Sequence, residues 1–254
     1  MRIRRTAGWG VAAFVTGALT TAPASAQDRP SDNEPGAAAQ FFRDVASDYI
    51  HFFSKESAIW IVTGGGLALA VHPADEAIRD ATQGPSTLTT TLEGGEWYGQ
   101  GLVQIPLSVA WWTIGHSMGS ARASSVGRDL VRAQINTASW TYPLKVAVGR
   151  TRPNDGPRSF PSGHASATFA TAMVLQDHYG WKVGVPVFAV AAYTAASRLT
   201  DNKHWASDVV FGAFLGIASA RTVTIHLRTT HVTVAPLLSS GAAGVQLSLA
   251  RSGT

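Results

Sequence analysis

Cysteine is absent from the 254 residues of this sequence. Its absence excludes disulfide bonds, zinc sites built from thiolates and cysteine nucleophiles, and it is compatible with an oxidising compartment. Nucleotide-binding loops and metalloprotease motifs are also missing. The triple glycine Gly64-Gly65-Gly66 lies in an apolar run, without the Lys-Ser or Lys-Thr pair that completes a phosphate loop.

Charged side chains are scarce, because Asp, Glu, Lys and Arg make up only 14% of the chain, and the formal net charge is +4. Three positive charges fall in a predicted signal peptide over residues 1–26, which would export the protein to the periplasm. Its parts are a basic start (Arg2, Arg4 and Arg5), an apolar run over residues 8–19 and the small-residue cleavage site Ala24-Ser25-Ala26. An uncleaved anchor is the alternative. Cleavage would leave a net charge of about +1, so we expect no nucleic-acid partner.

The apolar pattern that follows the signal predicts a mostly helical chain. Residues 27–36 are polar and contain proline, so we expect a flexible mature N-terminus. Residues 37–228 would form the helical domain, and residues 229–254 a β-hairpin tail. Within the domain, we expect helices over residues 37–53, 57–71, 75–82, 122–148 (one helix, or two with a break at Gly127), 162–178, 183–197 and 205–227, with a loop over residues 84–95.

Long apolar runs are few. Residues 97–121 carry no formal charge, and they are the best candidate for a membrane-spanning helix. Most other apolar runs fall short of the ~20 residues that a span requires. The sequence therefore leaves two interpretations open, a soluble bundle and a bundle of short membrane helices with the site facing the periplasm.

A first group of cations stands around the end of the helix over residues 122–148. Lys145 lies near that end, and Arg152 follows in a loop marked by Gly, Pro and Asn-Asp. The two cations can converge on one anion. Alternatively, they only favour the negative end of the helix dipole.

A second group is Pro161-Ser162-Gly163-His164. Ser162 is placed to cap a helix, and Gly163 lets an anion approach the free N–H groups of the first turn. His164 would face the same anion and donate a proton to a leaving group. An ordinary serine cap with an exposed histidine is the alternative.

A third group spans residues 197–208. If the chain is helical from His204 onward, His204 and Asp208 stand one turn apart on one face. The carboxylate can then accept one imidazole N–H and leave the other nitrogen free to react. Arg198 is a planar, permanently charged group suited to a phosphate. An interhelical loop with a surface ion pair is the alternative.

Together the three groups have the parts that phosphoryl transfer needs, namely positioning groups and positive charge for the equatorial oxygens. His204, which has a carboxylate partner, would be the nucleophile, and His164 the acid. Side-chain cations would do what Mg²⁺ does elsewhere, so we expect no metal and no cofactor. Arg150 and Arg158 are candidates to extend the anion site toward a diphosphate.

The order and spacing of these groups resemble the three-part signature of the type 2 phosphatidic acid phosphatase and vanadium haloperoxidase superfamily. The matching residues are Lys145 with six residues to Arg152-Pro153, then Pro161-Ser162-Gly163-His164, then Ser197-Arg198 with five residues to His204 and three more to Asp208. The resemblance covers roughly residues 100–220 and implies an all-α bundle of about six core helices. It also implies a phosphohistidine on His204, with Asp208 as its orienter and His164 as general acid. Phosphate would be held by Lys145, Arg152, Arg198 and the amides of Ser162 and Gly163.

The expected function is a metal-independent phosphatase for phosphate monoesters, with a phosphorylated lipid or a small organic phosphate as its substrate and with possible membrane association. Two alternatives belong to other classes. One is a vanadate-dependent haloperoxidase, because the resemblance implies that the same cage can bind vanadate through His204. The other is a non-catalytic bundle that docks on a membrane.

Overall fold

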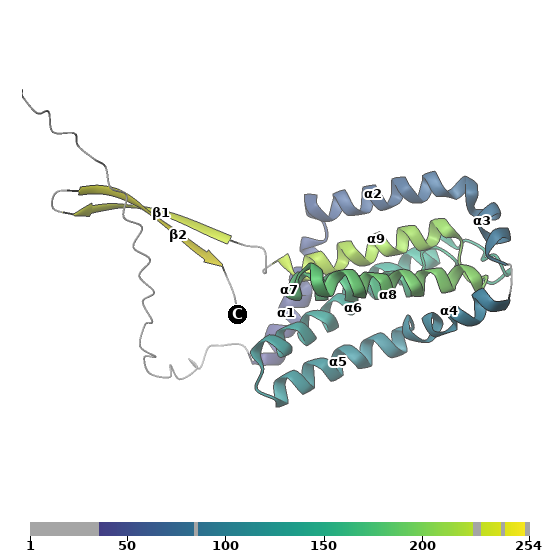
Figure 1. Cartoon of the computed structure of the whole chain (residues 1–254), viewed down its shortest axis with the longest axis horizontal. Coiled ribbons are helices and arrows are strands. Elements are labelled where there is room, and N and C mark those ends of the chain that lie inside the picture. Colours follow the sequence, from purple (N-terminus) through teal and green to yellow (C-terminus); the bar gives the residue numbers. More distant parts are fainter. Residues whose placement is uncertain (1–35, 84–85, 226–229, 240–241, 252–254) are drawn as a thin grey trace, which may run out of the picture. The chain divides into compact units, whose positions relative to one another are not determined.

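The computed structural model describes residues 36–83, 86–225, 230–239 and 242–251. The predicted signal over residues 1–26 and nearly all of the segment 27–36 lie outside the described residues. The helices are α1 (Ala37–His51), α2 (Lys55–Val71), the short 3₁₀ helix η1 (His72–Ala74), α3 (Asp75–Thr82), α4 (Ser86–Tyr98), α5 (Gly101–Ser117), α6 (Ala121–Val148), α7 (Gly163–Tyr179), α8 (Trp181–Thr200) and α9 (Ala206–Val223). The all-α bundle predicted from the sequence is confirmed (Figure 1).

A β-hairpin follows the bundle in the sequence, as predicted. Strand β1 (Thr230–Ser239) pairs antiparallel with β2 (Ala242–Arg251). Their register runs from Thr230 opposite Arg251 to Ser239 opposite Ala242.

The core of the bundle lies where α6, α7 and α9 pack together. Its buried side chains come from all three helices: Val126, Leu130, Ala133, Ala170, Met173, Val174, Leu175, Ile217, Ala220 and Val223. Around this core, α2 lies along α9 and α5 lies along α6 (Figure 1). Both α2 and α5 expose large apolar side chains on the surface of the bundle.

Two glycines allow α9 to approach α7 closely. A Cβ atom on Gly212 would lie 2.6 Å from the carbonyl oxygen of Ser162, and one on Gly216 would lie 2.1 Å from that of Ser166. Both distances are far below van der Waals contact, so a larger residue would force the helices apart. This packing places the start of α7 against the start of α9.

Three sequence predictions about the helices need correction or refinement. Residues 84–95 do not form a loop, because α4 covers most of them and continues to Tyr98. The run over residues 97–121 is not one long helix, since Gly99 and Gln100 separate α4 from α5. In contrast, α6 is continuous through Gly127, whose absent Cβ makes room for the backbone of Trp112, 2.3 Å from where that Cβ would lie.

The candidates for membrane spans also differ from the predicted one. Among the described residues, three helical stretches are long and apolar enough to cross a membrane: residues 55–82, α8 and α9. The predicted span instead yields α5, which has 17 residues. Much of α9 is buried inside the bundle, whereas the stretch 55–82 is mostly exposed.

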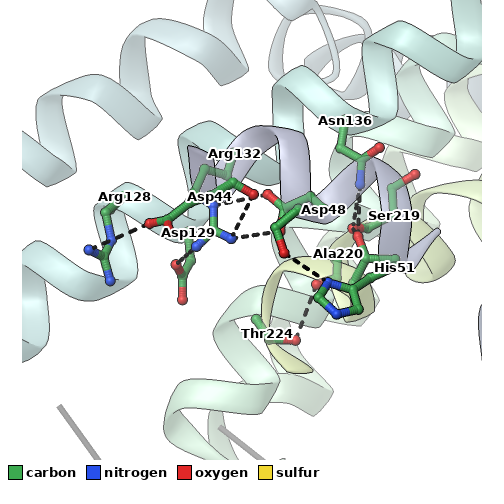
Figure 2. A network of polar contacts seen from close by, with 12 residues as sticks. Asp44, Asp48, His51, Arg128, Asp129, Arg132, Asn136, Ser219, Ala220 and Thr224 are labelled. Atoms are coloured by element: carbon green, nitrogen blue, oxygen red, sulfur yellow. Dashed lines mark hydrogen bonds and ion pairs between the residues drawn. The ribbon is translucent and has the colours of Figure 1, made fainter. Parts of the chain in front are cut away.

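A buried charged network ties α1 to α6 (Figure 2). Arg132 donates to both carboxylate oxygens of Asp48, at 2.6 and 2.9 Å, and to Asp129 at 3.2 Å. His178 at the end of α7 contacts the other oxygen of Asp129 at 2.9 Å. Arg132 lies about 20 Å along α6 from Lys145, at 1.5 Å per residue. The network therefore fastens α1 to the bundle well away from the predicted site.

Candidate active site

The predicted site residues come from four helix ends and the loops between them. Lys145 lies in the last turn of α6, Arg152 in the loop after it and His164 in the first turn of α7. Arg198 lies in the last turn of α8, and His204 just before α9. These five side chains, together with Gly163, line one cavity of about 610 Å³. The structure thus brings the three sequence groups together.

His204 and Asp208 face each other, but not in the way that the sequence suggested. His204 precedes α9 instead of belonging to it, with Trp205 as the cap and Asp208 in the first turn. The Nδ1 atom of His204 lies 3.8 Å from Oδ2 of Asp208, which is beyond hydrogen-bond distance. This nitrogen is buried and has no hydrogen-bond partner. Burial lowers the pKa of His204 to about 4, although the nearby carboxylate acts in the opposite direction. The imidazole is therefore neutral at pH 7.

Asp208 is completely buried, and both of its oxygens accept hydrogen bonds. Ser159 donates its hydroxyl proton to Oδ2, and the backbone N–H of Trp205 donates to the same oxygen at 2.9 Å. Arg150 donates to Oδ1 at 2.7 Å. The sequence analysis had missed Ser159, and it had offered Arg150 only as a candidate to extend the anion site toward a diphosphate. Arg150 does not line the cavity and instead contacts the carboxylate behind His204, whereas Arg158 does line the cavity.

The three predicted phosphate-binding cations differ in how they are engaged. Lys145 donates to the carbonyl of Arg158 at 3.1 Å, and burial, followed by the charge of Arg152, lowers the pKa of Lys145 to about 8. Arg152 has a buried Nε atom without a hydrogen-bond partner. Arg198 already forms ion pairs with Asp201 and, at 3.7 Å, with Glu96. Of these three cations, Arg152 is therefore the one with a buried donor that has no partner among the described residues.

Ser162 lies behind the cavity and not in it. Its hydroxyl oxygen accepts the N–H of Ala165 at 3.4 Å, which makes it the cap of α7. Its own N–H donates to the carbonyl of Asp208 at 3.0 Å. The hydroxyl of Ser162 thus caps α7, and its N–H joins α7 to α9, which pack closely at Gly212. Of the two residues whose amides were expected to bind phosphate, only Gly163 lines the cavity.

His164 is covered by α4, which the sequence had not placed at the site. Its Nε2 atom lies 3.1 Å from the carbonyl oxygen of Glu96. Gly99, at the end of the same segment, packs against the ring so closely that a Cβ would lie 2.7 Å from Cδ2. Burial, and then the charges of Arg198 and His204, lower the pKa of His164 to about 3. His164 is therefore neutral in the empty cavity.

Beyond the cations, the cavity has a polar wall and an apolar wall. Gln134, Thr137, Thr141 and Ser166 line it from α6 and α7, and the hydroxyl of Thr137 is buried without a partner. Ile105 of α5 and Tyr142 and Val146 of α6 supply apolar surface. The cavity therefore accommodates an anion joined to a larger, partly apolar group.

The chain is similar to known proteins over part of its length. Residues 154–231 match the PAP2 superfamily; Lys145 and Arg152 precede the matched segment. The chain is 34% identical over 99 residues to a lipid A 1-phosphatase of Porphyromonas gingivalis, a match that covers 37% of this chain and 21% of that protein. It is 32% identical over 83 residues to a lipid A 4′-phosphatase of Helicobacter pylori, covering 33% of this chain and 42% of the relative. The chain thus spans less than half the length of these curated relatives.

A solved structure shares the helical fold. The first transmembrane PAP2-type phosphatidylglycerolphosphate phosphatase from Bacillus subtilis superposes with a TM-score of 0.51 at 21% identity. The superposition covers 72% of this chain and 92% of that one. The resemblance seen in the three sequence groups is confirmed by the match of residues 154–231 to the PAP2 superfamily.

Proposed function

We propose that this protein is an exported phosphatase that removes phosphate from a lipid phosphate monoester through a phosphohistidine on His204. The observation that carries the proposal is the convergence of Lys145, Arg152 and Arg198 on a neutral, buried histidine backed by Asp208. The unsatisfied donor of Arg152 points to an anion as the missing partner. The named lipid phosphatases among the relatives support the same substrate class.

In the first step, the neutral imidazole of His204 attacks phosphorus. Because Nδ1 faces Asp208, the proton belongs on Nδ1, and Nε2 carries the free electron pair. A P–N bond forms while the bond from phosphorus to the leaving oxygen breaks. Asp208 stabilises the positive charge that develops on the ring. Lys145, Arg152 and Arg198 stabilise the equatorial oxygens, so the charge that a metal ion would supply comes from side chains.

His164 completes the proton balance. A bound phosphate dianion adds negative charge beside it and so raises its pKa, reversing the effect of Arg198. The protonated ring then donates to the leaving oxygen. In the second step, water attacks the phosphohistidine, His164 accepts the proton of that water and the P–N bond breaks. As phosphate leaves, His164 releases to solvent the proton that it took up from solvent when the substrate bound, and both histidines return to their starting states.

The surface of the bundle supports a lipid substrate and membrane association. Large apolar side chains are exposed on α2, α5 and α8, among them Leu69 (75% exposed), Leu102 (87%) and Trp181 (71%). Their burial in a bilayer is favourable by about 25 cal/mol per Å². Ile105, exposed on the surface of α5, also lines the cavity and supplies an apolar path to it.

The test is phosphate release from detergent-solubilised protein in the presence of EDTA. Three substrates are compared: phosphatidic acid in mixed micelles, lipid A in mixed micelles and a water-soluble aryl phosphate. We expect release from at least one lipid. We also expect a covalent phosphate that is stable in base and labile in acid, as a phosphohistidine is, to appear on the wild type.

His204→Ala should abolish both signals, whereas His116→Ala, which changes an exposed histidine of α5, should change neither. Wild-type turnover in His204→Ala would exclude His204 as the nucleophile. Release that stops in EDTA and returns with a divalent metal would overturn the metal-independent mechanism.

A further inference from the structure

Asp75, in the first turn of α3, contacts the region behind the nucleophile from a distant part of the chain. Its Oδ1 atom accepts the backbone N–H of Ser207 at 2.9 Å, and its Oδ2 atom accepts the hydroxyl of Ser207 at 2.6 Å. Asp75 is only 4% exposed. The residues in contact stand 132 positions apart, and Asp75 precedes all three sequence groups.

Arg150 joins this carboxylate to the carboxylate of Asp208. One of its terminal nitrogens donates to Oδ2 of Asp75 at 2.8 Å. The other donates to Oδ1 of Asp208 and to the hydroxyl of Ser207, both at 2.7 Å. The guanidinium also lies over the ring of Trp205, 5.4 Å from its centre. Asp75, Arg150 and Asp208 thus form a continuous chain of charge-assisted hydrogen bonds.

The chain of contacts fixes the orientation of Asp208 on the side away from His204. With Oδ1 held by Arg150, the other oxygen is directed toward the imidazole. Arg150 alone has several rotatable bonds, so it needs a second anchor to hold one position. Asp75 provides that anchor, and its two bonds to Ser207 fix it to α9 itself.

We infer that Asp75 is a positioning residue for the phosphoryl transfer: through Arg150 and Ser207 it fixes the Asp208 carboxylate that orients His204. The inference rests on the proposed function of His204. Asp75 does not line the cavity and does not touch phosphate. Its loss should therefore lower the rate of the chemical step and leave anion binding unchanged.

The first experiment compares two isosteric substitutions on α3. Asp75→Asn keeps the shape but weakens the bond to Arg150, whereas the matched control Asp80→Asn changes an exposed carboxylate that pairs only with Arg79 in the described structure. We expect Asp75→Asn to lower kcat by about 10- to 100-fold. This is the range typical of removing a group that orients a metal-binding histidine, and Asp75 orients the nucleophilic histidine in a comparable way. KM and the dissociation constant for inorganic phosphate should stay within about twofold, and Asp80→Asn should match the wild type.

The second experiment removes the bridge and replaces it from solution. Arg150 borders an apolar cavity of about 320 Å³ between α2 and α9, so Arg150→Ala leaves an opening next to Asp208. Millimolar methylguanidinium should restore part of the lost kcat in Arg150→Ala. Methylguanidinium should restore no activity to His204→Ala. It should also leave kcat unchanged in the control Arg221→Ala, because Arg221 pairs with Glu56 and not with Asp208. Rescue of this kind separates positioning from a purely structural role.

The ¹⁵N spectrum of the His204 ring gives a readout that does not depend on turnover. In the wild type, we expect the proton on Nδ1, and in Asp75→Asn we expect a mixture of tautomers. If no phosphate ester is hydrolysed by the wild type but this spectral change is present, the proposed function fails and the positioning role stands. Unchanged kcat and an unchanged spectrum in a folded Asp75→Asn protein would overturn the inference. So would a loss confined to KM or to melting temperature.

Discussion

The packing around Gly163 leaves room for a Cβ atom, although this position has none. A Cβ atom there would lie 3.7 Å from Lys145 and 3.8 Å from Thr141, which are ordinary contact distances. Its backbone is not in the left-handed region, so neither protein packing nor conformation requires glycine. The open space faces the cavity in which the phosphate is proposed to bind.

Gly163→Ala should therefore separate stability from activity. We expect a melting temperature equal to or above that of the wild type, because alanine is the better helix former by about 1 kcal/mol. Turnover of a lipid phosphate should fall by about tenfold or more, because the methyl group occupies space next to Lys145. Thermal unfolding and steady-state kinetics on the same sample test this, and a variant as active as the wild type would refute it.

The two cavity histidines predict how stability changes with pH. Burial lowers the pKa of His164 to about 3 and that of His204 to about 4, against 6.5 in an unfolded chain. Between pH 6.5 and about 4, the unfolded state takes up protons that the folded state does not. The free energy of unfolding is therefore highest above pH 6.5, where both histidines are neutral in the folded and the unfolded state. It decreases as the pH falls toward 4.

Denaturant unfolding between pH 7 and pH 4.5 measures this contribution. The free energy of unfolding of the phosphate-free wild type should decrease, by on the order of 3 kcal/mol for His204. His204→Gln, which cannot protonate, should show a smaller decrease than the wild type. Equal slopes for the two proteins would mean that His204 is not held neutral in the folded state.

The contact between α7 and α9 depends on small residues. Gly216 would place a Cβ only 2.1 Å from the backbone of Ser166, and a backbone atom cannot move as a flexible side-chain end can. The same helices carry His164 and Asp208 at their adjoining ends. A shift in their spacing is therefore a shift in the geometry of the proposed active site.

Gly216→Ala should destabilise the protein by about 1–3 kcal/mol and lower kcat, because overpacking moves both helices. Gly66→Ala in α2 is the matched control, since nothing lies within 4 Å of the position of its Cβ. That substitution should be neutral or stabilising by about 0.5–1 kcal/mol. Chemical denaturation of both variants gives the comparison, and equal effects would contradict the packing argument.

Helix α4 brings an acidic side chain to a site that otherwise gathers cations. An oxygen of Glu96 lies 3.7 Å from a terminal nitrogen of Arg198, and Glu96 is about half exposed. Phosphate and this carboxylate would compete for the same guanidinium. The pair is partly solvated, so its strength lies within about 1 kcal/mol.

Glu96→Gln should therefore bind inorganic phosphate up to about fivefold more tightly, with a correspondingly lower KM. Glu93→Gln, which changes another exposed carboxylate of α4, should leave both constants unchanged. Calorimetric titration with phosphate measures the affinity. Weaker binding in Glu96→Gln would show that Glu96 assists the site and does not compete with the anion.

The bundle as a whole buries several charged side chains beside its apolar core and exposes many large apolar side chains on its surface. Its buried groups include Asp48, Asp129, Arg132, Asp208 and Arg198, whereas many leucine, isoleucine, valine and tryptophan side chains of α2, α5 and α8 are exposed. Exposed apolar patches of this extent mark surfaces that interact with a membrane or another protein. A membrane is the occupant that also agrees with the proposed lipid substrate.

We expect the protein to remain in the membrane pellet after an alkaline carbonate wash and to be released by detergent. The intact mass of the extracted protein tests the predicted cleavage after Ala26 in the same experiment. If the protein in the washed pellet lacks residues 1–26, the mature chain is itself bound to the membrane. Release of that mature chain by carbonate would contradict membrane embedding.

Local features of the sequence were enough to predict much of the fold and site. The Ser162 cap and the helix end at Gly180 follow from residue types within a few positions of one another. Lys145, Arg152, His164 and His204 are candidates chosen from local spacing, and they line one cavity. Such signals are readable because capping and motif spacing are short-range. The sequence did not predict helix α4, because its residues, rich in threonine and glycine, show no helical periodicity of apolar side chains.

The sequence by itself determined which residues are the candidates for the chemistry, since their types and spacing are typical of a phosphate site. Only the tertiary structure decided what holds them: Asp75 and Arg150 behind Asp208, Glu96 over Arg198 and His164, and Ser162 turned away from the cavity to join α7 to α9. These contacts link residues that stand 58 to 132 positions apart, except those around Ser162. Positions so far apart meet only after the helices have packed, and helix packing depends on volume and close approach, which no short pattern encodes.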